Sequence, residues 1–182
     1  MAAQSGKDKL NTPVIDFSLK GTDERLYSPD SFEEKEILII IFMCNHCPYV
    51  KAVTDRLISF QEKFYEKNVQ LIGINSNDTV SYPEDSFENM KIYSDEYGMN
   101  FPYLFDETQE TARKYNAVCT PDIYVYDKDR MLRYRGRIDD NWKEESKVTV
   151  KDLEKATELL LEGKEIDFEQ IPSIGCSIKW KN

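Results

Sequence analysis

The chain has 182 residues, of which 40% are hydrophobic and 32% charged, a composition typical of one folded domain with its own core. With 24 Lys and Arg against 34 Asp and Glu, its formal net charge is −10, which disfavours binding to nucleic acids or anionic membranes. The longest apolar run, residues 37–43, is far shorter than the roughly 20 residues of a membrane span. Residues 1–11 are polar and lack the apolar stretch of a secretory signal, so we expect a cytoplasmic location.

Apolar patterning predicts strands and helices in alternation, within a single domain over 13–182 that follows a flexible lead over 1–12. The expected strands cover 14–19, 37–42, 69–74, 101–105, 123–126 and 131–138. The expected helices cover 48–64, 86–97, 106–115 and 149–163, and 164–182 form a C-terminal tail without a clear period. This order predicts an α/β fold with a central mixed sheet flanked by helices.

The junction between the strand over 37–42 and the helix that follows carries the strongest chemical signal. Cys44 and Cys47 form a C-x-x-C at the start of a helix whose apolar residues recur every three or four positions. The unpaired N–H groups and the dipole at a helix N-terminus favour a thiolate, which is the form of cysteine that attacks disulfides. We interpret Cys44 as the nucleophile and Cys47 as the thiol that resolves the mixed disulfide.

His46, the only histidine, lies between these two cysteines. A protonated imidazole there would stabilise the Cys44 thiolate, although an exposed residue that merely starts the helix is the alternative.

Two further cysteines stand alone in the sequence and are possible auxiliary thiols. Cys119 is either a small buried core residue or a thiol near the redox pair. Cys176 lies in the expected tail, where it either packs as an ordinary residue or relays electrons and resolves an intermediate. A zinc site built from all four cysteines is a further alternative, although closed zinc sites usually show two close cysteine pairs.

The chain resembles the thioredoxin-like superfamily, in its branch related to alkyl hydroperoxide reductase and the TlpA-type thiol-disulfide oxidoreductases. The resemblance rests on Cys44-Asn45-His46-Cys47 between a strand and a helix, and on Cys119-Thr120-Pro121 ahead of a later strand. It implies that Pro121 is a cis-proline facing the redox pair, with the Thr120 backbone ready to pair with an extended substrate.

The same resemblance implies thiol-disulfide exchange with a protein or low-molecular-weight disulfide, with electrons supplied by an upstream thiol reductant. It implies no metal and no organic cofactor.

Two positions depart from the patterns of related families. Leu38 stands where thioredoxins carry a buried acid that relays protons, so an acid from elsewhere or a water must take that role. Ile41 stands where peroxiredoxins carry the threonine that activates peroxide, which argues against a dedicated peroxidase. A thiol peroxidase using Cys44 and a zinc-stabilised thioredoxin-like binding module are the two alternative functions.

Overall fold

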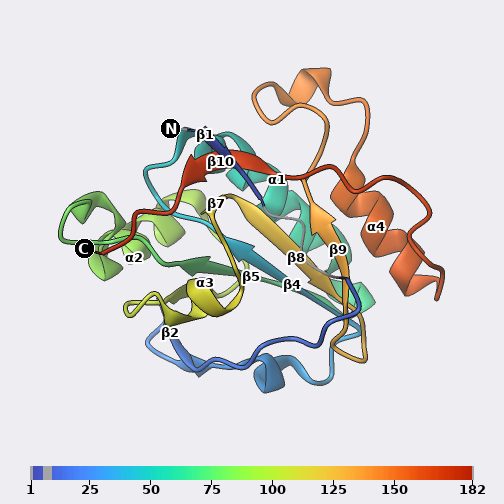
Figure 1. Cartoon of the computed structure of the whole chain (residues 1–182), viewed down its shortest axis with the longest axis horizontal. Helices are drawn as coiled ribbons and strands as arrows, with labels where there is room; N and C mark the ends of the chain where they lie inside the picture. The colour runs from blue at the N-terminus through green and yellow to red at the C-terminus, as the bar shows by residue number, and fades with distance from the viewer. Residues whose placement is uncertain (1, 6–9, 182) are drawn as a thin grey trace.

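The computed structural model describes residues 2–5 and 10–181. A central sheet has helices packed on both faces, and a smaller sheet lies along one end (Figure 1). The strands are β1 (Ala2–Gln4), β2 (Leu19–Gly21), β3 (Leu26–Tyr27), β4 (Ile37–Phe42), β5 (Val69–Asn75), β6 (Tyr103–Phe105), β7 (Cys119–Thr120), β8 (Asp122–Tyr126), β9 (Leu132–Gly136) and β10 (Ile174–Ser177). The helices are α1 (Pro48–Phe64), α2 (Phe87–Tyr97), α3 (Glu110–Lys114) and α4 (Asp152–Leu161), with short 3-10 turns η1 (Pro29–Phe32), η2 (Tyr65–Lys67), η3 (Pro83–Asp85) and η4 (Glu145–Lys147). No helix of the described residues combines the length and the apolar character needed to cross a bilayer.

The main sheet has the strand order β3-β2-β6-β5-β4-β8-β9. β4 runs parallel to β5 and antiparallel to β8, so the sheet is mixed, as the sequence predicts. β4 and β5 lie at its centre because their side chains are apolar on both faces, a pattern that only a sheet covered on both sides can bury.

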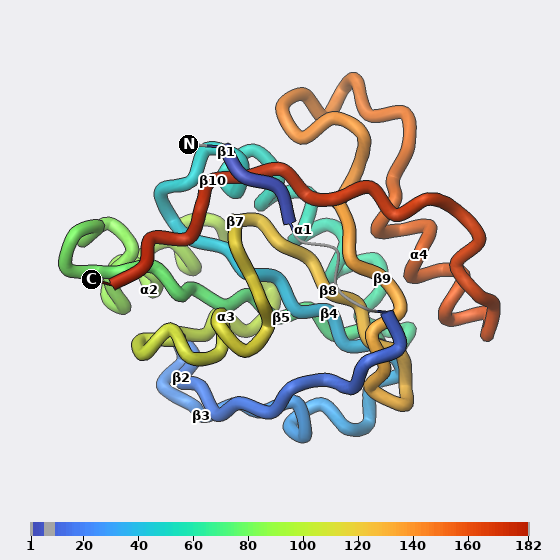
Figure 2. Tube along the Cα trace, in the orientation of Figure 1, coloured from blue at the N-terminus to red at the C-terminus, as the bar shows by residue number. Residues whose placement is uncertain are grey.

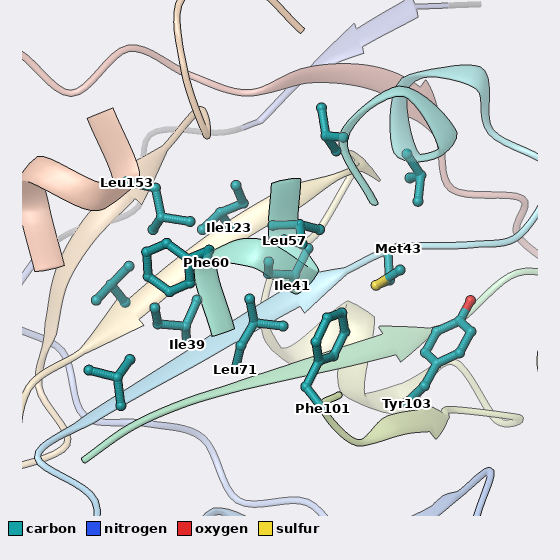
Figure 3. Close-up of a cluster of buried hydrophobic side chains, with 14 of the residues drawn as sticks. Ile39, Ile41, Met43, Leu57, Phe60, Leu71, Phe101, Tyr103, Ile123 and Leu153 are labelled. Carbon is teal, nitrogen blue, oxygen red and sulfur yellow. The ribbon is translucent and has the colours of Figure 1, made fainter. Parts of the chain in front are cut away.

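Alternate residues of β4 divide the core between the two faces of the sheet. Ile37, Ile39 and Ile41 pack with residues of α1, α2 and α4, and Figure 3 shows part of this cluster. The intervening residues of β4 pack with α3 and with the segment around η1. Every residue of β4 is buried. This burial anchors the strand, and therefore also the turn that leads from its end into α1.

The second sheet has the order β1-β10-β7 and departs from the sequence prediction (Figure 2). Residues 2–4, expected within a flexible lead, form β1, and the expected tail over 164–182 contains β10. The Ser5 N–H donates to the Ser173 carbonyl at 3.0 Å, which extends the pairing beyond the strands. Both strands are too short to show an apolar period, so backbone hydrogen bonds rather than patterning hold them in place.

Several other elements are shorter than expected, and α3 and the first expected strand differ most. α3 begins at Glu110 rather than 106, because the Asp106 carboxylate accepts the N–H groups of Thr111 at 3.3 Å and Ala112 at 2.9 Å from outside the helix. Of the strand expected over 14–19, only Leu19 is in a strand, β2.

Leu57 tests the core between α1 and the sheet. Its side chain is 0% exposed, so Leu57→Ala is expected to lower the free energy of unfolding by about 2–5 kcal/mol through lost burial and a residual cavity. Leu26→Ala is the control, since Leu26 is 70% exposed and its loss should change stability by no more than about 0.5 kcal/mol. Equal losses for both variants in chemical denaturation would contradict this description of the core.

Candidate active site

The C-x-x-C motif lies where β4 turns into α1. Cys47 is the N-cap residue of α1, and Pro48 occupies the first turn, where its missing N–H costs nothing. The Met43 N–H donates to the Ile74 carbonyl at 2.9 Å and continues the β4–β5 pairing up to the first cysteine. Both thiols are buried, with Cys44 1% and Cys47 0% exposed.

Thr120 joins the two sequence motifs. The Thr120–Pro121 peptide bond is cis, as the resemblance implies. The Cys44 Sγ lies 3.4 Å from the Thr120 hydroxyl, and the Cys47 thiol donates to the Thr120 carbonyl at 3.2 Å. Residues more than 70 positions apart in the sequence therefore meet at a single residue of β7.

The two isolated cysteines occupy different surroundings. Cys176 is partly exposed, pairs with Thr120 in the β10–β7 register, and packs against the buried cluster that contains Cys44 and Cys47. Cys119 is fully buried, its thiol points to the Pro121 carbonyl at 3.7 Å, and burial raises its pKa. Of the two possible auxiliary thiols, Cys176 is the one that packs against the cluster of Cys44 and Cys47.

Asp85 is the site residue that the sequence analysis missed. It is 0% exposed, and its carboxylate accepts the N–H groups of Asn45 at 2.8 Å and His46 at 3.2 Å, together with the Asn77 amide at 2.8 Å. Asp85 therefore accepts the hydrogen bonds of the two backbone N–H groups that lie between Cys44 and Cys47. Asp85 comes from η3 in a polar, proline-containing insertion, where no spacing relates it to the cysteines.

His46 pairs with Asp85 rather than standing free beside Cys44. Its Nδ1 lies 2.6 Å from the Asp85 carboxylate, and its ring stacks on Tyr82 with centroids 5.4 Å apart. The hydrogen bond to Asp85 raises the pKa of His46 despite its burial. Burial would raise the pKa of Asp85, but hydrogen bonds from His46 and Asn77 outweigh it and lower that pKa.

The thiols titrate in the opposite order to the expected one. The hydrogen bond from Cys44, supported by those from Cys176, Thr120 and the Val50 N–H, outweighs burial and lowers the pKa of Cys47 to about 4. The hydrogen bond to Cys47, burial and the nearby Asp85 carboxylate all raise the pKa of Cys44. The pKa of Cys47 therefore lies below that of Cys44, because the hydrogen bond between the two thiols favours the Cys47 thiolate and the Asp85 carboxylate disfavours a second negative charge on Cys44.

Within residues 2–5 and 10–181, one group of side chains has its ligand atoms close enough together for a metal ion. These are Cys44, His46 and Asp85, whose ligand atoms lie within 4.8 Å of one another. The four-cysteine zinc set considered from the sequence is not gathered in this part of the chain.

The Asp85–His46 pair can be tested by NMR, because the chain has only one histidine. Asp85→Asn retains the size of the side chain but removes its charge, so the pKa of His46 is expected to fall below the wild-type value. Glu84→Gln is the matched control, since Glu84 is an exposed neighbour that acts on His46 through charge alone and should give a smaller fall. Equal shifts in the two variants would contradict the pairing.

The stability cost of Asp85→Asn should follow the same pair. The raised pKa of His46 gives stability that is present below about 6.5 and is lost as the pH rises through the folded value. The lowered pKa of Asp85 gives stability that is present above about 3.9 and is lost as the pH falls through the folded value. The cost is therefore expected to be largest between about pH 4 and 6.5.

Sequence and structure comparisons identify the family and the fold. A model of the AhpC/TSA family matches residues 10–135. The crystal structure of an uncharacterized conserved protein from Geobacillus kaustophilus is 41% identical with a TM-score of 0.94, over 100% of this chain and 97% of that one. The structure of a hypothetical protein from Sinorhizobium meliloti 1021 is 36% identical with a TM-score of 0.93, over 98% of both chains.

A thiol:disulfide interchange protein of the thioredoxin family from Chlorobium tepidum TLS shares 19% identity with a TM-score of 0.66, over 85% of this chain and 99% of that one. At that identity the likeness concerns the fold alone, which is thioredoxin-like. The search of curated proteins finds no match. The family model covers well over half of the sequence and includes both cysteines of the redox pair, and the chain belongs to the AhpC/TSA family.

Proposed function

We propose that this protein is a thiol-disulfide oxidoreductase that uses Cys44 and Cys47 as its reversible redox pair. The observation that carries the proposal is that both sulfurs of the C-x-x-C meet Thr120 at the start of α1, with Cys44 Sγ 3.4 Å from its hydroxyl and Cys47 Sγ 3.2 Å from its carbonyl oxygen. Two thiols in contact, one of them with a strongly lowered pKa, are equipped to exchange with a disulfide. Membership of a family of redox proteins supports the same chemistry.

The pKa values of the two thiols suggest which cysteine is the nucleophile and which resolves the mixed disulfide. Cys47 carries the thiolate and is the better nucleophile in the reduced protein, in place of Cys44. The Cys44 thiol then attacks Cys47 Sγ in the mixed disulfide, releases the reduced substrate and leaves a Cys44–Cys47 disulfide. An external thiol reductant restores the pair by the reverse exchange. Substrates of this class are proteins or small molecules that contain a disulfide.

Asp85 fits the role of the acid that is missing at Leu38. The Leu38 side chain lies in the core on the other face of the sheet, packed away from α1. The Asp85 carboxylate lies within 4.8 Å of the Cys44 sulfur and is the acid that raises the pKa of that thiol. We assign it a positioning role, in which it orders the Cys-x-x-Cys loop and keeps Cys44 protonated until Cys47 has reacted.

A glutathione redox titration, with alkylation trapping and mass spectrometry, tests this function. The wild-type protein is expected to show one reversible two-electron couple assigned to a Cys44–Cys47 disulfide. Cys44→Ser and Cys47→Ser should each abolish that couple. Cys119→Ala should retain it, because Cys119 lies outside the contacting thiols.

Other outcomes would replace the proposed function. A tightly bound zinc ion in the purified protein, with no redox couple, would indicate a metal-stabilised module. Saturable peroxide reduction that disappears in Cys44→Ser, again without a Cys44–Cys47 couple, would indicate a thiol peroxidase.

A further inference from the structure

The buried position of the redox pair raises a question of access. Disulfide exchange requires sulfur-to-sulfur contact, yet the two thiols of the pair are 1% and 0% exposed. Cys119 is also 0% exposed, whereas Cys176 is partly open to solvent. Among the four cysteines, Cys176 is thus the one that an external disulfide can reach in this conformation.

Cys176 also lies next to the pair. It packs against the buried cluster that contains Cys44 and Cys47, and it lies opposite Thr120, whose carbonyl oxygen is 3.2 Å from the Cys47 sulfur. Cys47 therefore lies between a partly exposed thiol on one side and a buried thiol on the other. The sequence separates Cys176 from the pair by most of the length of the domain, and the β10–β7 pairing brings them together.

The placement of β10 is specific rather than incidental. A Cβ added at Gly175 would lie 2.0 Å from the Thr120 carbonyl oxygen, so only glycine allows β10 to lie this close to the Thr120–Pro121 peptide. β10 is held on both flanks, where the Ser5 N–H donates to the Ser173 carbonyl at 3.0 Å and the Lys179 N–H donates to the Asn77 side chain at 2.9 Å. These contacts hold Cys176 against Cys47.

We propose that Cys176 is the solvent-facing thiol of a three-cysteine relay, in which it exchanges with an external disulfide and Cys47 passes the electrons of the buried pair to it. The proposal rests on the proposed function, keeps Cys44 and Cys47 as the redox pair, and replaces direct attack of Cys47 on the external disulfide by attack of Cys176. The lowered pKa of Cys47, to about 4, keeps it a thiolate, whereas the raised pKa of Cys176, to about 11, means that Cys176 must first lose its proton to solvent in order to attack.

The relay consists of three balanced exchanges. Cys176 loses its proton to water and attacks one sulfur of the external disulfide, whose other sulfur leaves as a thiolate and takes up a proton. The Cys47 thiolate attacks Cys176 Sγ, so the second external thiolate leaves and takes a proton from water, and a Cys47–Cys176 disulfide forms. Cys44 loses its proton and attacks Cys47 Sγ, which releases Cys176 as a thiolate that is then protonated. Two electrons from Cys44 and Cys47 thereby reduce one external disulfide to two thiols, and Cys176 is regenerated.

A trapping experiment tests the intermediate. In Cys44→Ala the third exchange cannot occur, so oxidation by glutathione disulfide is expected to stop at a Cys47–Cys176 disulfide, which peptide mapping identifies. Cys44→Ala with Cys119→Ala should give the same product. A mixed glutathione disulfide on Cys47 as the end product, with Cys176 still reduced, would overturn the relay.

Kinetics separate this inference from the proposed function. Cys176→Ser is expected to slow formation of the Cys44–Cys47 disulfide by glutathione disulfide at least about tenfold, because the accessible attacking thiol is lost. The midpoint of the Cys44–Cys47 couple should stay at the wild-type value, and Cys119→Ala should react at the wild-type rate. An unchanged rate in Cys176→Ser, with the couple intact, would refute the relay and leave the proposed function standing.

Gly175→Ala provides a test that keeps every cysteine. The added Cβ must displace β10 from Thr120 and move Cys176 away from Cys47, so the rate of oxidation is expected to fall as it does in Cys176→Ser. A rate above that of the wild type would instead show that β10 is a cover over the redox pair, and would overturn the relay.

Discussion

The contacts made by Thr120 determine how the site is assembled. Its carbonyl oxygen lies 3.2 Å from the Cys47 sulfur, its hydroxyl lies 3.4 Å from the Cys44 sulfur, and its backbone lies opposite Cys176 in the small sheet. Because β7 leads through Pro121 directly into β8, this residue is fixed to a strand that pairs with the central strand β4. Thr120 therefore positions both the C-x-x-C loop and the C-terminal strand β10. Its contacts determine where the sulfurs of Cys44, Cys47 and Cys176 lie.

The charge distribution around that point depends on Asp85. Burial of a carboxylate costs free energy unless hydrogen bonds replace those lost from water. The Asp85 carboxylate is hydrogen-bonded to the N–H groups of Asn45 and His46, the Asn77 side-chain amide and the His46 ring. Those donors are then not available to a thiolate at Cys44. The negative charge of the reduced pair accordingly settles on Cys47, at the N-terminus of α1.

The sequence was most informative where structure is local. A continuous apolar strand, a C-x-x-C and a helix of regular period predict the β4–α1 junction and its chemistry, because each signal lies within a few residues of the next. The roles of Asp85 and Cys176 could not be predicted in the same way. Asp85 lies in an insertion without periodicity, and β10 is held by backbone pairing to a two-residue strand, which no side-chain pattern records.

The central claim is that the redox pair keeps its thiolate on Cys47, between two thiol donors. The most direct measurement is the ultraviolet absorbance of the thiolate as a function of pH, for the reduced wild type and for Cys44→Ser and Cys47→Ser. We expect a thiolate that persists down to about pH 4 in the wild type, remains detectable below neutral pH in Cys44→Ser and disappears in Cys47→Ser. A low-pH thiolate that survives in Cys47→Ser and is lost in Cys44→Ser would contradict the account.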